Sequence, residues 1–153
     1  MSVCTFIAAD IPLGEVMPLR EYPVAIRIEG KTVSIEDGCA DDNFCLRPFR
    51  DASVYTDMKY AVSLFWSYTE GRAERIVSYI RDALRDTDCV EIWHVWLMDY
   101  WEYEDRPVIH KTTVHADQLA AEHIREIDEA DIWNQPDKRW PERPSFYCLR
   151  VIK

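Results

Sequence analysis

The chain has 153 residues, of which 48% are apolar and 30% are charged, a balance typical of one globular domain and not of a disordered chain. Its formal net charge is -10, from 18 Lys and Arg against 28 Asp and Glu. Because nucleic acids and anionic membranes repel such a charge, and because no Lys/Arg cluster offsets it, we expect no binding to either.

The first fifty residues predict a β-rich extension that ends in an acidic loop. Residues 3–8 have the composition of a strand. Alternating apolar residues at 24–28 and 33–35 indicate a hairpin that turns at Gly30 and Lys31, where glycine supplies the positive φ of a two-residue turn. The alternation is lost from residue 36 to residue 50.

Residues 60–152 predict the element order β-α-β-β-α-β. Apolar alternation or β-branched runs indicate strands at 60–68, 89–97, 107–115 and 146–152. Helical spacing of apolar residues predicts one helix over 73–84, after a capping turn at 69–71. A second helix is predicted after a cap at Asp117, with its apolar stripe at Leu119, Ala120, Ile124 and Ile127. The strand at 89–97 is apolar on both faces, which favours a central position or a covering partner.

This order is that of the split βαβ or ferredoxin-like arrangement. We therefore predict an α+β fold with a ferredoxin-like core at about 60–152, an antiparallel sheet and both helices on one face. Residues 1–50 would form an N-terminal β extension within a single domain, 1–153. Either this extension or a second subunit would cover the other sheet face. A fold shared by so many unrelated proteins does not indicate a function.

The cysteines and the start of the chain indicate a reducing compartment. The chain has five cysteines without a C-x-x-C pair, at Cys4, Cys39, Cys45, Cys89 and Cys148. Residues 1–14 lack the basic and apolar regions of a secretory signal, and no stretch reaches the length of a membrane span. We therefore predict a cytoplasmic protein.

Common cofactor and catalytic motifs are missing from the sequence. It contains no G-x-G-x-x-G, Walker, H-E-x-x-H or G-x-S-x-G motif, and only 4 glycines. The acidic stretch 37–43 offers oxygen ligands for Ca²⁺ or Mg²⁺, but its spacing does not match an EF-hand loop. We predict no cofactor and no metal site.

Residues 99–105 are all acidic or aromatic, and they would form the tip of a hairpin between the strands at 89–97 and 107–115. Aromatic side chains anchor many interfaces, and carboxylates speed the encounter with a basic partner. The predicted binding residues are Tyr100, Trp101, Glu102, Tyr103, Glu104 and Asp105. This composition resembles that of small acidic inhibitors such as toxin-immunity proteins. We therefore predict a non-enzymatic interaction module that binds a basic protein or self-associates.

His94 and His110 support an alternative hypothesis. In the same hairpin register they would lie on one sheet face, where Trp66 and Trp96 could complete a pocket for a small aromatic or carbonyl compound. The protein would then be a small-molecule-binding protein or an enzyme, with both histidines as catalytic candidates. The competing interpretation is that His94 is a core residue with one hydrogen bond and His110 a surface residue.

Overall fold

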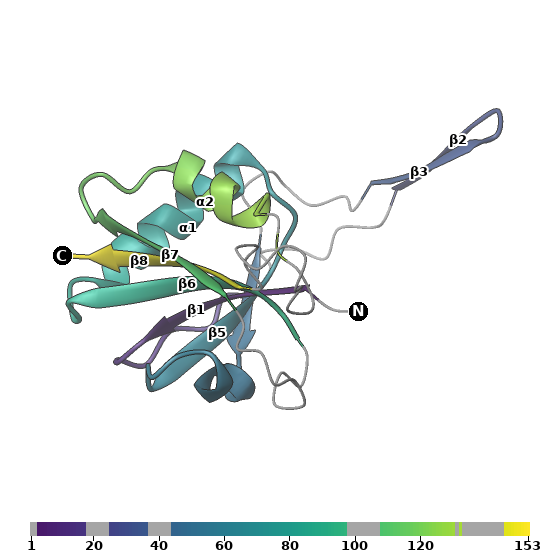
Figure 1. The fold of residues 1–153 in the computed structure, drawn as a ribbon. Helices are drawn as coiled ribbons and strands as arrows, with labels where there is room; N and C mark the ends of the chain where they lie inside the picture. The colour runs from purple at the N-terminus through teal and green to yellow at the C-terminus, as the bar shows by residue number, and fades with distance from the viewer. Residues whose placement is uncertain (1–2, 18–24, 37–43, 98–107, 131, 133–145) are drawn as a thin grey trace.

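The computed structural model describes residues 3–17, 25–36, 44–97, 108–130, 132 and 146–153, which form a six-stranded sheet, a two-stranded hairpin and two α-helices (Figure 1). The six strands are β1 (Val3–Ala9), β4 (Cys45–Pro48), β5 (Tyr60–Phe65), β6 (Cys89–Trp96), β7 (Ile109–His115) and β8 (Phe146–Ile152). The hairpin consists of β2 (Ala25–Glu29) and β3 (Thr32–Glu36), and the helices are α1 (Glu70–Ala83), α2 (Ala121–Asp128) and the 3-10 helix η1 (Arg50–Val54). The predicted α+β class is confirmed.

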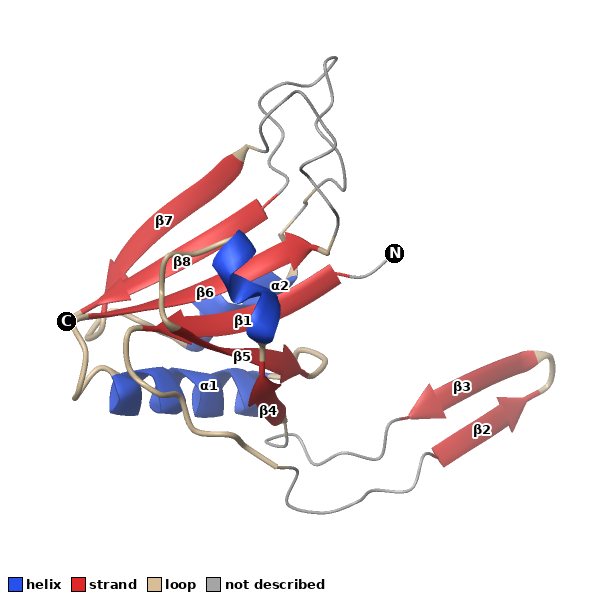
Figure 2. Ribbon diagram, turned by 90° about the horizontal axis from the view of Figure 1, so that it is seen from below, coloured by secondary structure: helices blue, strands red, loops and turns tan. Residues whose placement is uncertain are grey.

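The strands lie in the order β4-β5-β1-β6-β8-β7 (Figure 2). All neighbours are antiparallel except β7 and β8, which are parallel. The predicted hairpin between the strands at 89–97 and 107–115 is wrong, because β6 pairs with β1 and β8 while β7 lies beyond β8. The predicted element order β-α-β-β-α-β is present from β5 to β8, but a ferredoxin-like core is not confirmed, because β1 lies between β5 and β6 and because β7 and β8 are parallel.

β1 lies in the middle of the sheet and not in a covering extension. Phe6, Ile7 and Ala8 are successive residues that point to alternate faces, and all three are fully buried. A strand that is apolar on both faces gains most from a central position, where both of its faces are covered. The same reasoning holds for β6, whose predicted central position is confirmed.

Both helices cover one face of the sheet, as predicted (Figure 1). Thr69 caps α1 by accepting a hydrogen bond from the Arg72 backbone N–H at 3.2 Å. α2 begins after Ala120 and not after the predicted cap Asp117. Asp117 lies in a turn instead, in which the N–H groups of Gln118 and Leu119 bond to the His115 carbonyl.

The opposite face is covered around η1 by an aromatic cluster. The Phe6 ring lies 4.9 Å from Phe49, 5.7 Å from Tyr55 and 6.1 Å from Trp93, measured between centroids. Phe49 belongs to the predicted N-terminal extension, so part of this extension contributes to the cover. The hairpin does not, since among the described residues β2 and β3 pair only with each other and stand away from the sheet (Figure 2). The hairpin itself is confirmed, with Gly30 at φ 62° in its turn.

The acidic loop predicted at 36–50 contains a strand that the sequence analysis missed. β4 is an edge strand of four residues, and Val16 pairs with its outer side through two backbone hydrogen bonds with Leu46, of 2.9 and 3.1 Å. No helix among the described residues is long and apolar enough to cross a membrane.

Candidate functional site

The acidic-aromatic run lies outside the described residues. Tyr100, Trp101, Glu102, Tyr103, Glu104 and Asp105 all fall within 98–107. Their predicted role as a contact surface therefore stays a prediction. The acidic stretch 37–43 also lies outside the described residues.

His94 and His110 share a sheet face but do not face each other across a hairpin. The strand registers place Thr5, His94, Tyr147 and His110 in one row across β1, β6, β8 and β7. His110 is exposed and stacks on Tyr147, with ring centroids 4.7 Å apart. Because β8 separates β6 from β7, the backbones at the two histidines are roughly 10 Å apart. Tyr147 therefore lies between the two histidines, which the predicted hairpin would place next to each other.

His94 is a buried histidine held by one hydrogen bond. Its side chain is 7% exposed, and Nδ1 lies 2.9 Å from Thr5 Oγ1. Burial lowers the pKa of His94 from its ordinary value of 6.5, so the ring is neutral at neutral pH. Nε2 has no hydrogen-bond partner among the described residues. A neutral ring in this position can donate or accept one further hydrogen bond, depending on the direction of the bond to Thr5.

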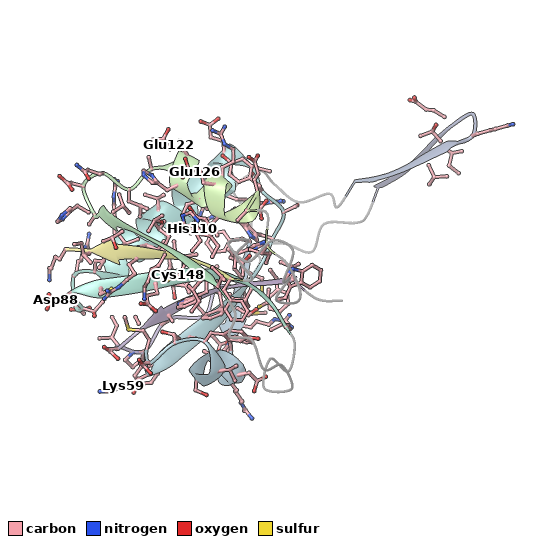
Figure 3. All side chains as sticks on the ribbon, viewed as in Figure 1. Lys59, Asp88, His110, Glu122, Glu126 and Cys148 are labelled. Atoms are coloured by element: carbon pink, nitrogen blue, oxygen red, sulfur yellow. The ribbon has the colours of Figure 1, made fainter. Side chains whose placement is uncertain are left out.

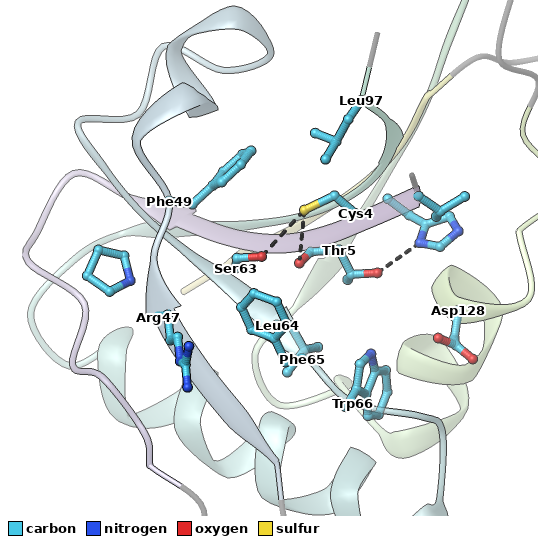
Figure 4. A pocket seen from close by; sticks show the side chains of 13 residues that line it. Cys4, Thr5, Arg47, Phe49, Ser63, Leu64, Phe65, Trp66, Leu97 and Asp128 are labelled. Atoms are coloured by element: carbon cyan, nitrogen blue, oxygen red, sulfur yellow. Dashed lines mark hydrogen bonds between the residues drawn. The ribbon is translucent and has the colours of Figure 1, made fainter. Parts of the chain in front are cut away.

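A cavity of about 590 Å³ lies next to His94, at the end of the sheet where β1 begins and β5 and β6 end (Figure 4). Val3, Phe49, Phe65, Trp66 and Leu97 are among its apolar lining residues. Its polar lining residues are Cys4, Thr5, Arg47, Ser63, His94 and Asp128. Two of the four side chains predicted to form a pocket, His94 and Trp66, therefore line one cavity. His110 and Trp96 are not among its lining residues.

Asp128 contributes the acidic group of this cavity. It is the last residue of α2 and lies at the cavity in Figure 4. Burial, followed by the nearby charge of Glu129, raises the pKa of Asp128 above its ordinary value. The sequence analysis did not select Asp128, because only the packing of α2 on the sheet brings it toward His94 and Trp66.

Cys4 and Ser63 form a second polar pair in the cavity wall, with Sγ and Oγ 3.5 Å apart. Burial raises the pKa of the Cys4 thiol, and the hydrogen bond with Ser63 only partly opposes this effect. The thiol is therefore protonated at neutral pH and is a poor nucleophile. We assign it a role in lining the cavity.

A buried carboxylate on the opposite sheet face was also missed. Glu91 is 4% exposed, and its Oε2 accepts hydrogen bonds from Thr56 Oγ1 at 2.7 Å and Trp93 Nε1 at 2.9 Å. Its Oε1 lies 3.2 Å from Lys111 Nζ and 3.4 Å from Arg150 Nε. Burial alone would raise the pKa of Glu91, but the hydrogen bonds and the Lys111 charge outweigh it and hold the pKa below its ordinary value. The sequence signal that could have identified this carboxylate is a single acidic residue within the apolar strand predicted at 89–97.

The Glu91 cluster is better explained by stability than by ligand binding. Thr56 follows η1, so its bond to Glu91 fastens the covering segment to the sheet. Among the described residues, no group of three or more His, Cys, Asp and Glu side chains is placed to hold a metal ion. Comparisons with protein-family models, with curated proteins and with solved structures give no match.

Proposed function

We propose that this protein binds a small aromatic molecule carrying a neutral carbonyl or hydroxyl group, in the cavity lined by His94. The observation that carries the proposal is the state of this histidine. Thr5 Oγ1 lies 2.9 Å from Nδ1, while Nε2 has no partner among the described residues, and His94 lines a cavity of about 590 Å³. A ring nitrogen without a protein partner can bond to a ligand or to a water molecule.

The lining of the cavity supports the ligand class. Phe49 and the consecutive residues Phe65 and Trp66 provide aromatic surface from two places in the chain. A volume of this size accommodates a small molecule, and mostly apolar sites with few polar groups are typical of such pockets. Burial keeps His94 neutral, so a neutral hydrogen-bonding group suits it better than an ion.

Binding would be tested by ligand-observed NMR, with a panel of small aromatic carbonyl and phenolic compounds and the full chain. We expect His94→Gln to weaken binding, because the Gln amide cannot restore the imidazole geometry. His110→Gln is the matched control, since it changes the same residue type on the same face but does not line the cavity. Asp128→Asn has its own control in Glu126→Gln, an exposed acid of the same helix (Figure 3).

Two results would contradict the proposal. One is that no compound of the panel binds to a protein whose circular dichroism shows it folded. The other is that bound compounds respond equally to His94→Gln and His110→Gln, which would place them elsewhere. A bound ligand should also raise the melting temperature, because it binds the folded state alone.

We also propose, as a second candidate, that residues 99–105 bind a basic protein in the cytoplasm. The net charge of -10 supports attraction to such a partner, and the free thiols of the described cysteines are consistent with a reducing compartment. The test replaces Trp101→Ala together with Glu102→Lys and Glu104→Lys, and scores binding to basic nucleases. Glu122→Lys with Glu126→Lys makes the same change of charge on α2. Binding that both variants lower equally would reflect net charge and not this run.

A further inference from the structure

The two edge strands of the six-stranded sheet differ in how they are protected from pairing with another strand. At one edge, β4 has four residues, ends at Pro48, and is bridged on its outer side by Val16. At the other edge, β7 has seven residues without proline and pairs only with β8 among the described residues (Figure 2). Proteins usually shorten, twist or cover a sheet edge, because its unpaired backbone groups readily pair with another strand. Among the described residues, neither a bridging residue nor a proline protects β7, and its one charged side chain of the kind that protects edges is Lys111.

The backbone groups that β7 leaves free follow from its pairing with β8. The Phe146 N–H bonds to the Val108 carbonyl at 3.3 Å, and the Ala116 N–H bonds to the Ile152 carbonyl at 2.8 Å. In a parallel ladder, alternate residues of each strand bond to the neighbour, so the even-numbered residues of β7 face β8. The N–H and C=O groups of Ile109, Lys111 and Thr113 therefore point outward. His115 offers only its N–H, since a turn already occupies its carbonyl.

We propose that a second copy of this chain pairs with β7 in antiparallel register, with the two-fold axis at Thr112. This register places Lys111 opposite Thr113 of the second copy, twice by symmetry. A register centred on Lys111 would place the two lysines directly opposite each other, which is unfavourable. A register centred on Thr113 would leave Ile109 without an opposite residue in the strand.

The surroundings of the edge predict how the association of two copies responds to salt. Val108 and Ile109 are 39% and 45% exposed, and both begin the free edge. Pairing would cover part of this apolar surface and join the two sheets into one. Each copy carries a net charge of -10, so the two copies repel each other at low salt. Added salt screens this repulsion, and we expect it to strengthen the dimer.

Sedimentation velocity over a concentration series of the full chain tests the proposal. Thr113→Lys places like charges opposite each other at two symmetric positions and should raise the dimer dissociation constant by roughly tenfold. Thr113→Glu is the matched control, because the same exposed position then faces Lys111 with an opposite charge, and this dimer should be retained. Circular dichroism would show that both variants fold.

A second measurement checks the register directly. Thr112→Cys should form a disulfide-linked dimer on mild oxidation, because the two-fold axis brings the Cα atoms of this pair to roughly 4.5 Å. His110→Cys, on the same strand and face, opposes Val114 in this register and should crosslink no more than the unaltered chain. A chain that stays monomeric at every concentration and salt level overturns the proposal. So does a dimer that Thr113→Lys leaves intact, or one in which the two cysteine variants crosslink equally.

Discussion

Glu91 allows a sharp test of how this sheet tolerates a buried charge. Glu91→Gln keeps the size of the side chain and removes the charge. The amide oxygen can take the place of Oε2 and still accept from Thr56 and Trp93. The amide NH₂ group then faces Lys111 and Arg150, which are donors themselves. These two side chains are 43% and 41% exposed, so they can turn toward water.

The expected cost follows from which bonds are lost. Glu91→Gln gives up two ion pairs whose cations are partly exposed, which corresponds to about 1–2 kcal/mol of unfolding free energy. Glu91→Leu also leaves the buried Trp93 Nε1 and Thr56 Oγ1 without their acceptor, and each such loss costs about 1–3 kcal/mol. We therefore expect about 3–8 kcal/mol for Glu91→Leu. At this chain length, each kcal/mol lowers the melting temperature by about 2–4 °C.

The pH dependence gives an independent check. The pKa of Glu91 is lower in the folded state than in the unfolded chain, so its charge stabilises the fold above the unfolded-state pKa. This contribution is lost as the pH falls through the folded-state pKa, where the carboxyl becomes neutral like Gln. Urea unfolding of the unaltered chain and of Glu91→Gln should therefore give free energies that differ at pH 7 and converge in acid. The exposed substitution Glu122→Gln serves as the control.

Two outcomes would refute this reasoning. If Glu91→Gln costs as much as Glu91→Leu, the ion pairs and not the bonds to Trp93 and Thr56 dominate. If the difference between the unaltered chain and Glu91→Gln persists at low pH, the charge of Glu91 is not its cause.

Two further predictions concern the helix face and the buried thiols. Thr69→Ala should lower the unfolding free energy by about 1 kcal/mol in urea titrations, because α1 loses the side-chain acceptor of the Arg72 N–H, whereas Thr69→Ser should keep most of it. Burial is the main cause that raises the pKa of Cys148 to about 12, so at pH 8 only roughly one thiol in ten thousand is ionised. Mass spectrometry after alkylation of the native protein should therefore find Cys148 modified more slowly than the partly exposed Cys89, and equal rates would contradict this.

Local features of the sequence predicted the elements well. β8 occupies the predicted residues, and β1, β5, β6, β7 and both helices lie at the predicted places with ends shifted by a few residues. Alternation and helical spacing act within ten or twenty residues, so they can be read from one segment at a time. The turn at Gly30 is a similar case, because the positive φ depends on one residue.

The pairing of the strands could not be read in this way. β6 and β7 are adjacent in the chain, yet β8 separates them in the sheet. Nothing within either strand specifies its neighbour, since pairing depends on surfaces contributed by distant segments. β4 was missed for a related reason: it has only four residues, two of them exposed, and β5 beside it provides the partner that makes it a strand.

The insertion of β1 between β5 and β6 is what creates the candidate site. In the observed register His94 is flanked by Thr5 on one side and Tyr147 on the other, and Leu64 lies on the far side of Thr5. If β5 bordered β6 directly in the same register, His94 would lie beside Leu64, whose side chain cannot bond to Nδ1. The hydrogen bond that orients the ring thus depends on residue 5, which belongs to the part of the chain predicted to be an extension. A fragment limited to residues 60–152 would lack this bond, so the ligand experiments require the full chain.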